Sequence, residues 1–185
     1  MNLPNFLSLL RIILVPLMVI FLIRGSYTYA FLVFIVAGVS DALDGFLARV
    51  LHQQTVLGSY LDPLADKALI TTSFVALAIL GLIPAWLAVI VISRDFIILL
   101  GILTLFIMSI SVEMKPAVVS KITTVLQIVT VLVVLMSRSF PGYAHYLTAK
   151  PFFWLTAAAT IISGFHYIRK GVGYVNSAPK NGMQN

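Results

Sequence analysis

Residues 41–66 read DALDGFLARVLHQQTVLGSYLDPLAD, and this stretch decides how the rest of the chain is interpreted. It holds four of the six acidic residues of the 185-residue chain, namely Asp41, Asp44, Asp62 and Asp66. The surrounding sequence is strongly apolar, since 61% of all residues are hydrophobic and only 10% are charged. A soluble domain carries roughly 25% charged residues. The composition therefore excludes secreted, cytosolic and disordered classes and favours one compact domain in lipid.

The apolar sequence on either side divides into six stretches that meet or approach the length needed to cross a bilayer, about 20 residues. We expect membrane-spanning helices near 6–23, 28–50, 59–81, 84–109, 117–137 and 151–169. The predicted fold is thus an all-α integral membrane protein with six transmembrane helices over residues 1–170. A polar, frayed cytoplasmic tail is expected over 171–185. The absence of cysteine excludes disulfides and thiol nucleophiles.

The distribution of basic residues predicts the orientation of these spans. Six spans place both termini on one side, and positive charge is enriched on the cytoplasmic side of membrane proteins. The opposite side would hold only Arg24, Arg138 and Lys150, and Arg94 lies within a span. The N-terminal side would hold the remaining basic residues, which are Arg11, Arg49, Lys67, Lys115, Lys121, Arg169, Lys170 and Lys180. We therefore expect cytoplasmic termini, and the scattered basic residues give no indication of nucleic-acid binding.

The four aspartates fall on two consecutive spans at a similar depth. Asp41 and Asp44 are three residues apart on one helix, and Asp62 and Asp66 are four apart on the next, so each pair shares a helix face. Alternatively, Pro63 starts the second of these helices with Asp62 as its N-cap. Asp41 and Asp66 both reach about 12–14 Å into the membrane at 1.5 Å per residue. We expect antiparallel packing of the two spans to bring the four carboxylates into one polar pocket open to the cytoplasm.

Four buried carboxylates require either protons or cations, because each ionised group costs at least roughly 2.5–3.5 kcal/mol in the membrane core. Oxygen-rich sites of this kind select Mg²⁺ or Mn²⁺, and paired metal ions suit phosphoryl chemistry. A purely structural alternative is that the aspartates pair with Arg49, Arg94 or Lys67. The small residues Gly45, Ala48 and Gly58 suit either close helix packing or close approach of a ligand.

The pattern Asp41-x2-Asp44-Gly45-x2-Ala48-Arg49-x8-Gly58-x3-Asp62-x3-Asp66 resembles the signature of the CDP-alcohol phosphotransferase family of integral membrane enzymes. The opening Asn2-Leu3-Pro4-Asn5 with Leu10-Arg11 is similar to the start of bacterial phosphatidylglycerophosphate synthases and of cardiolipin synthases in this family. The resemblance implies transfer of a phosphatidyl group from CDP-diacylglycerol to an acceptor hydroxyl with release of CMP. The resemblance also suggests that the protein forms a homodimer. The expected location is a membrane, and for a bacterial protein this would be the inner membrane.

The resemblance also implies roles for the motif residues. Asp41, Asp44 and Asp62 would hold two divalent metal ions, Mg²⁺ or Mn²⁺, with Asp66 adding to the metal site. Asp66 would in addition be the general base toward the acceptor hydroxyl. The residues that would line the cytidine-diphosphate side are Gly45, Ala48, Arg49 and Gly58.

Residues outside the motif bear on the acceptor. Arg94 and Lys121 are candidates for binding an acceptor phosphate. The alternative without a ligand is that Arg94 pairs with Asp95 inside the protein and that the Lys121 side chain extends to the membrane interface. The segment 96–101, FIILLG, lacks the second arginine usual in phosphatidylglycerophosphate synthases, and Ile92-Ser93-Arg94-Asp95 resembles eukaryotic-type cardiolipin synthases. We therefore expect phosphatidylglycerol as acceptor, with glycerol 3-phosphate as the alternative.

Two other classes could also place acidic residues in a membrane. A divalent cation transporter would need carboxylates at mid-depth in the membrane. Six spans without an internal repeat are, however, fewer than we expect for a transporter. A prenyltransferase would carry acidic runs on two separate helix pairs, whereas this chain has one cluster.

Overall fold

The computed structural model describes residues 3–50, 56–107, 118–140, 142 and 149–177. Within the helices, only the backbone is described for 3–8, 42, 44–50, 56–64, 106 and 174–177. The described chain is all-helical. Its helices are α1 (Leu3–Ile23), α2 (Tyr27–Val50), α3 (Val56–Ile79), α4 (Ala85–Ile107), α5 (Val118–Ser139) and α6 (Lys150–Ser177).

These helices coincide closely with the six predicted apolar stretches, with two differences. Helix α3 begins at Val56 and runs through Pro63, so the alternative in which Asp62 caps a helix starting at Pro63 is wrong. Helix α6 continues to Ser177, so the segment expected to fray from residue 171 begins as helix. Helix formation here persists after the sequence turns polar, because backbone hydrogen bonding does not require an apolar side chain.

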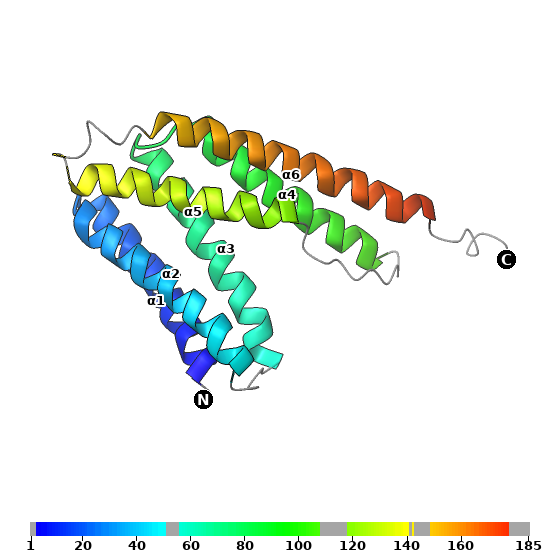
Figure 1. Ribbon diagram of the computed structural model, residues 1–185, viewed down its shortest axis with the longest axis horizontal. Helices are drawn as coiled ribbons and strands as arrows, with labels where there is room; N and C mark the ends of the chain where they lie inside the picture. Colours follow the sequence, from blue (N-terminus) through cyan, green and yellow to red (C-terminus); the bar gives the residue numbers. More distant parts are fainter. Residues whose placement is uncertain (1–2, 51–55, 108–117, 141, 143–148, 178–185) are drawn as a thin grey trace.

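Glycines end α1 and α3 in the same way. Gly25 has φ 69° and Gly81 has φ 67°, a left-handed conformation that favours glycine after the last turn of a helix. The amide of Ser26 donates to the Phe21 carbonyl at 2.9 Å, and that of Leu82 donates to the Leu77 carbonyl at 2.9 Å. Both turns therefore reverse the chain sharply, and Figure 1 places them at the same end of the molecule as the start of α6.

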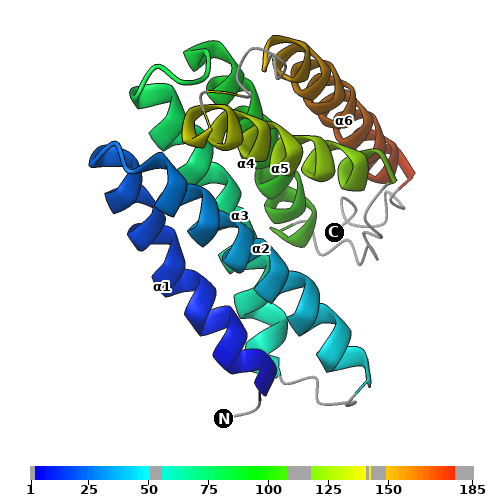
Figure 2. The same cartoon turned by 60° about the vertical axis from the view of Figure 1, so that its left-hand side comes forward.

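The helices form two packed groups that share α3 and α5. Helix α1 packs against both α2 and α3, and within the part of the chain that the structure describes α2 and α3 make few direct contacts with each other. Helix α6 packs against α4 and α5, and α5 returns to contact α2 (Figures 1 and 2). The two helices run antiparallel, as expected, and α1 contacts both of them.

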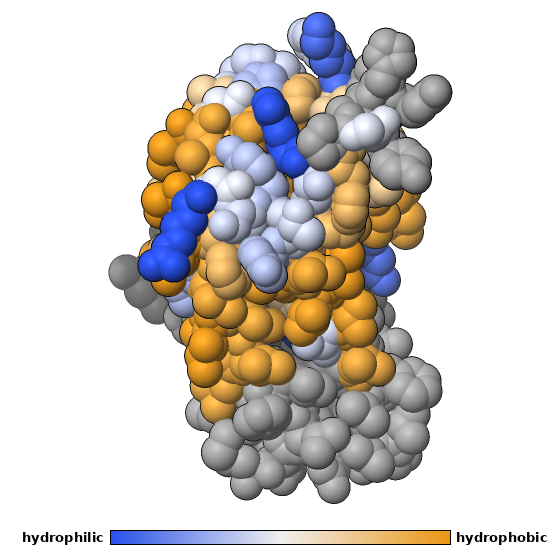
Figure 3. Space-filling view, turned by 90° about the vertical axis from the view of Figure 1, so that its left-hand side faces the viewer, coloured by the Kyte–Doolittle hydropathy of each residue, from blue (hydrophilic) through white to orange (hydrophobic). Residues whose placement is uncertain are grey.

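Apolar side chains cover much of the outside of the molecule as well as its core. The core includes fully buried Met18, Phe74 and Leu87, while Ile79, Trp154 and Phe165 are largely exposed. Figure 3 shows apolar side chains spread over the middle of one face. Within the described residues, Ala85–Leu105 and Val118–Ser139 are long and apolar enough to cross a membrane. An apolar exterior of this extent is consistent with a membrane protein.

Hydroxyl groups connect α5 to α6 inside this apolar surrounding. Thr130 Oγ1 and Thr156 Oγ1 lie 2.7 Å apart, and Thr123 Oγ1 donates to the Ala159 carbonyl at 3.1 Å. Such interhelical bonds contribute about 0.6 kcal/mol each in membrane proteins. They fix the register of α5 on α6 and hence the positions of Ser120 and Ser163, which belong to the site described below.

Candidate active site

Asp41 of α2 and Asp66 of α3 meet at the same basic side chain. Arg11 Nη2 lies 2.8 Å from Asp41 Oδ1, and Arg11 Nη1 donates a hydrogen bond to Asp66 Oδ1. The first contact is an ion pair whose angle lies outside hydrogen-bond geometry. Two of the four aspartates expected to share one pocket, Asp41 and Asp66, therefore contact the same guanidinium.

Arg11 itself is fully buried, with 0% of its side chain exposed. It comes from α1, the helix that contacts both α2 and α3, and its single positive charge lies between two carboxylates. One signal for Arg11 is present in the sequence, because an arginine inside an apolar span is functional by default and requires a partner. That signal could not name the partner, since Arg11 is far from both aspartates along the chain.

Both carboxylates keep a substantial accessible surface. Asp41 is 44% exposed and Asp66 is 41% exposed, although Arg11 between them is inaccessible. They lie at the edge of a cavity of about 290 Å³ between α2, α3 and α5. The cavity is lined by Phe34, Ile35, Gly38, Val39, Asp41, Asp66, Leu69, Ile70, Thr124, Ile128 and Leu132. The site therefore combines two partly exposed carboxylates, both in contact with the buried guanidinium of Arg11, with a mainly apolar cavity.

The other motif residues are placed by their backbone alone. Asp44, Gly45, Ala48 and Arg49 lie on α2, and Gly58 and Asp62 lie on α3, but their side chains are outside the described set. Helical continuity puts Asp44 one turn beyond Asp41 and Asp62 one turn before Asp66. The predicted alignment of each pair along one helix is therefore present in the backbone.

The donor chemistry of this site suits a hard divalent cation, for which carboxylate oxygens are the preferred ligands. Asp41 and Asp66 each present an accessible carboxylate at one location. The residues whose side chains are described contain no group of three or more histidine, aspartate or glutamate side chains that could hold a metal. A four-aspartate metal pocket therefore remains a prediction that depends on Asp44 and Asp62.

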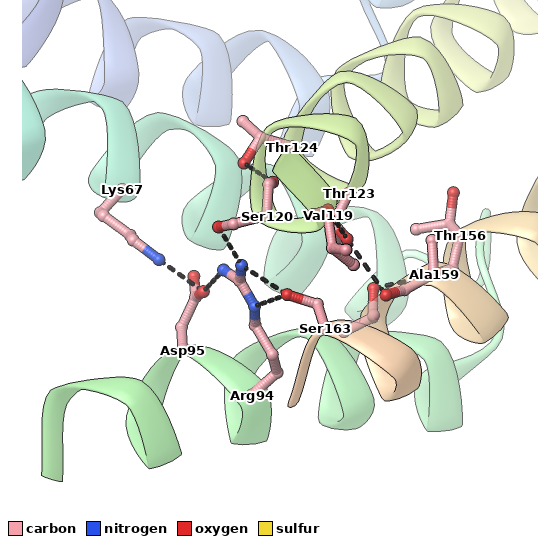
Figure 4. A network of polar contacts seen from close by, with 11 residues as sticks. Lys67, Arg94, Asp95, Val119, Ser120, Thr123, Thr124, Thr156, Ala159 and Ser163 are labelled. Atoms are coloured by element: carbon pink, nitrogen blue, oxygen red, sulfur yellow. Dashed lines mark hydrogen bonds and ion pairs between the residues drawn. The ribbon is translucent and has the colours of Figure 1, made fainter. Parts of the chain in front are cut away.

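Arg94, predicted to bind an acceptor phosphate, is instead engaged inside the protein (Figure 4). Its side chain is 5% exposed, and its Nη1 donates to Asp95 Oδ1 at 2.6 Å. Nη2 donates to Ser163 Oγ at 3.0 Å and to Ser120 Oγ, and Nε donates to Ser163 Oγ at 3.3 Å. The structure thus matches the alternative of an internal Arg94–Asp95 pair.

Two further basic residues, Lys121 and Lys67, have exposed side chains. Lys121 lies in the first turns of α5, next to Ser120, and is exposed. Lys67 follows Asp66 on α3, is 52% exposed, and places its Nζ 2.5 Å from Asp95 Oδ1. The pairing of Lys67 with α4 was not predicted, because the sequence shows only that the lysine follows the motif.

Fold and site together define a helical membrane-type protein in which aspartates gather beside an apolar chamber. The chain belongs to the CDP-alcohol phosphatidyltransferase family, whose family model matches residues 1–162. It is 34% identical over 190 residues to a human (Homo sapiens) cardiolipin synthase (CMP-forming), covering 92% of this chain. It is 30% identical over 184 residues to the Bacillus subtilis CDP-diacylglycerol–glycerol-3-phosphate 3-phosphatidyltransferase, covering 91% of this chain and 94% of that protein. The chain spans only 63% of the length of the human and rat cardiolipin synthases that it matches.

Proposed function

We propose that this protein transfers the phosphatidyl group of CDP-diacylglycerol to an acceptor hydroxyl and releases CMP. One observation supports this best: in a chain of this family, Asp41 and Asp66 converge beside an apolar cavity. Such a site offers acidic groups for phosphoryl chemistry and an apolar space for the acyl chains of a lipid. The comparisons give no support to the cation transporter alternative, since the matching family is one of transferases.

The reaction requires a base for the acceptor, and Asp66 is the proposed one. Its carboxylate takes the proton from the acceptor hydroxyl while the oxygen bonds to the phosphorus of the phosphatidyl group. The bond from that phosphorus to the bridging oxygen breaks, and CMP leaves with this oxygen. Arg11 holds Asp66 Oδ1 by a hydrogen bond, which fixes the carboxylate relative to Asp41. A base fixed in this way contributes typically 10²–10⁴-fold to the rate.

The proposed metal ligands are Asp41, Asp44, Asp62 and Asp66, and the proposed ions are two Mg²⁺ or Mn²⁺. Bound there, the ions would neutralise pyrophosphate and leaving-group charge. Gly45, Ala48, Arg49 and Gly58 are proposed to line the cytidine-diphosphate side, because they follow the same two helix faces. The protein is proposed to cross a bacterial inner membrane six times, with cytoplasmic termini, and to form a homodimer.

Phosphatidylglycerol is the acceptor that we propose, with glycerol 3-phosphate as the alternative. Relatives named for both reactions match the chain, so the comparisons do not choose between them. The choice rests on the modest basic charge near the site: Arg94 is committed to internal partners, and the segment 96–101 adds no arginine. A single phosphodiester charge needs fewer cations than a phosphate monoester.

The test supplies the purified protein in lipid nanodiscs with Mg²⁺ or Mn²⁺, CDP-diacylglycerol and one acceptor at a time. We expect CMP release and formation of cardiolipin with phosphatidylglycerol, and no CMP without an acceptor. Formation of phosphatidylglycerophosphate alone would overturn the proposed acceptor while supporting the reaction class. Absence of CMP release with either acceptor, from protein that elutes as a single folded species, would overturn the proposed function.

A further inference from the structure

A cluster of two cations and one carboxylate lies next to the proposed catalytic aspartate. Lys67 Nζ and Arg94 Nη1 both contact the same oxygen, Asp95 Oδ1, at 2.5 Å and 2.6 Å (Figure 4). Two positive charges and one negative charge leave this cluster with a formal net charge of +1. A surplus positive charge near a membrane interior is costly unless an anion faces it.

Exposure increases steadily through the cluster toward Lys67. Arg94 is 5% exposed, Asp95 is 14% exposed and Lys67 is 52% exposed. The guanidinium of Arg94 donates to Asp95, Ser120 and Ser163, so each of its three nitrogens is already engaged. An ammonium has three N–H donors, and the contact with Asp95 uses one of them. The surplus charge is therefore accessible through Lys67 and not through Arg94.

The cluster also lies beside the cavity that contains the aspartates. Lys67 directly follows Asp66, which lines that cavity from α3. On the facing helix α5, Thr124 lines the cavity, and its hydroxyl donates to the carbonyl of Ser120, the residue that accepts a bond from Arg94. Helices α3 and α5 thus line the cavity and also contact the basic cluster, α3 through Lys67 and α5 through Ser120, while Arg94 and Asp95 lie on α4.

We propose that Lys67 binds a phosphate oxygen of a lipid substrate, that Asp95 positions Lys67, and that Arg94 positions Asp95. This inference rests on the proposed function, because it places the anion next to the base Asp66. A net charge of +1 matches one phosphodiester charge. The phosphate belongs either to the acceptor phosphatidylglycerol or to CDP-diacylglycerol, and the two sources differ in whose KM changes.

The test compares Lys67→Met with Lys67→Arg in nanodiscs, varying CDP-diacylglycerol and phosphatidylglycerol separately. Loss of one charge-assisted hydrogen bond predicts a rise of about tenfold in the KM of one lipid, with kcat nearly unchanged. Lys67→Arg keeps the charge and restores most of the affinity. Lys150→Met, which removes an exposed lysine from the start of α6, is the matched control and leaves both KM values unchanged.

A second variant tests the positioning role without relying on turnover alone. Asp95→Asn is expected to weaken lipid binding, measured as the concentration of lipid that protects the protein against thermal unfolding. The same change made in a Lys67→Met background is expected to add nothing, because its effect acts through Lys67. An effect of equal size in both backgrounds would overturn the positioning role of Asp95.

The outcomes separate this inference from the proposed function. A raised KM for phosphatidylglycerol alone assigns Lys67 to the acceptor, and one for CDP-diacylglycerol alone assigns it to the donor. If Lys67→Met leaves both KM values unchanged while Asp66→Asn abolishes CMP release, the inference is wrong and the function stands. If the wild-type protein releases no CMP, the function itself fails.

Discussion

Replacing Arg11 with methionine removes the buried cation that joins Asp41 to Asp66. In the wild-type protein both carboxylates contact the guanidinium of Arg11. In the variant they would lie near each other without a positive charge from α1. Breaking a fully buried ion pair costs about 3–5 kcal/mol, and an exposed pair contributes about 0.2–1 kcal/mol. Because Asp41 and Asp66 are 44% and 41% exposed, we expect an intermediate loss of about 1–3 kcal/mol in the free energy of unfolding.

The same change is expected to reduce catalysis beyond its effect on stability. Partners that orient metal-binding carboxylates typically contribute 10–100-fold to affinity or activity, so we expect CMP release to fall by about that factor at a temperature where the variant stays folded. Arg11→Lys keeps the charge, but one ammonium cannot reproduce the two-nitrogen contact, and its activity is expected to lie between the two. CMP release in nanodiscs and thermal unfolding followed by circular dichroism provide the two measurements.

Arg24→Met is the matched control, since Arg24 is an exposed arginine at the turn that follows the same helix. It is expected to change neither unfolding nor CMP release. If Arg11→Met unfolds at the wild-type temperature and turns over at the wild-type rate, the Arg11 contacts neither hold nor orient the aspartates. A loss of stability with full activity would show that Arg11 is structural only.

Three further predictions test the site from other directions. Asp66→Asn keeps the shape of the side chain but removes the base, and CMP release should fall at least about 10²-fold with unfolding little changed; activity retained by this variant would exclude Asp66 as base. Removal of divalent ions with EDTA should stop the reaction, and Mg²⁺ or Mn²⁺ should restore it; turnover in EDTA would refute metal dependence. Gly38→Leu should raise the KM of a lipid substrate, because Gly38 lines the cavity. The protein should stay folded, because a Cβ at Gly38 meets open space. An unchanged KM for both lipids would show that the cavity is not used.

Much of the fold was predictable because apolar length and glycine turns are local properties. The expected gaps between apolar stretches, 24–27 and 82–83, lie at or next to Gly25 and Gly81, and each of these glycines has a left-handed conformation that stops a helix. The end of α6 was not predictable from apolarity, because its helix continues through the polar residues to Ser177. Local sequence therefore predicts where a helix starts and turns better than where a polar helix stops.

The candidate site was predictable only in part, because its chemistry depends on packing between distant segments. Spacing placed Asp41 and Asp66 at a similar depth, but it could not show that α1 contacts both of their helices and inserts Arg11. Likewise, the sequence suggested an internal pair of Arg94 with Asp95, but not the reach of Lys67 from α3 to the same carboxylate. Contacts between residues so far apart in the chain depend on how the helices are arranged in space. The hydrophobic periodicity of the sequence carries no information about that arrangement.

The two ion clusters together account for how few charges would serve the proposed reaction between two phosphate-bearing molecules. Among the described groups, Arg11 with two aspartates carries a net charge of −1, whereas Lys67 and Arg94 with Asp95 carry +1. Asp66 and Lys67 are neighbours on α3, and a helix turns about 100° per residue. The two clusters therefore lie on different sides of the same turn of α3. The negative cluster suits divalent cations, and the positive cluster suits a phosphate. Because α3 carries both Lys67 and Asp66, a substrate phosphate bound by Lys67 would lie next to the proposed base.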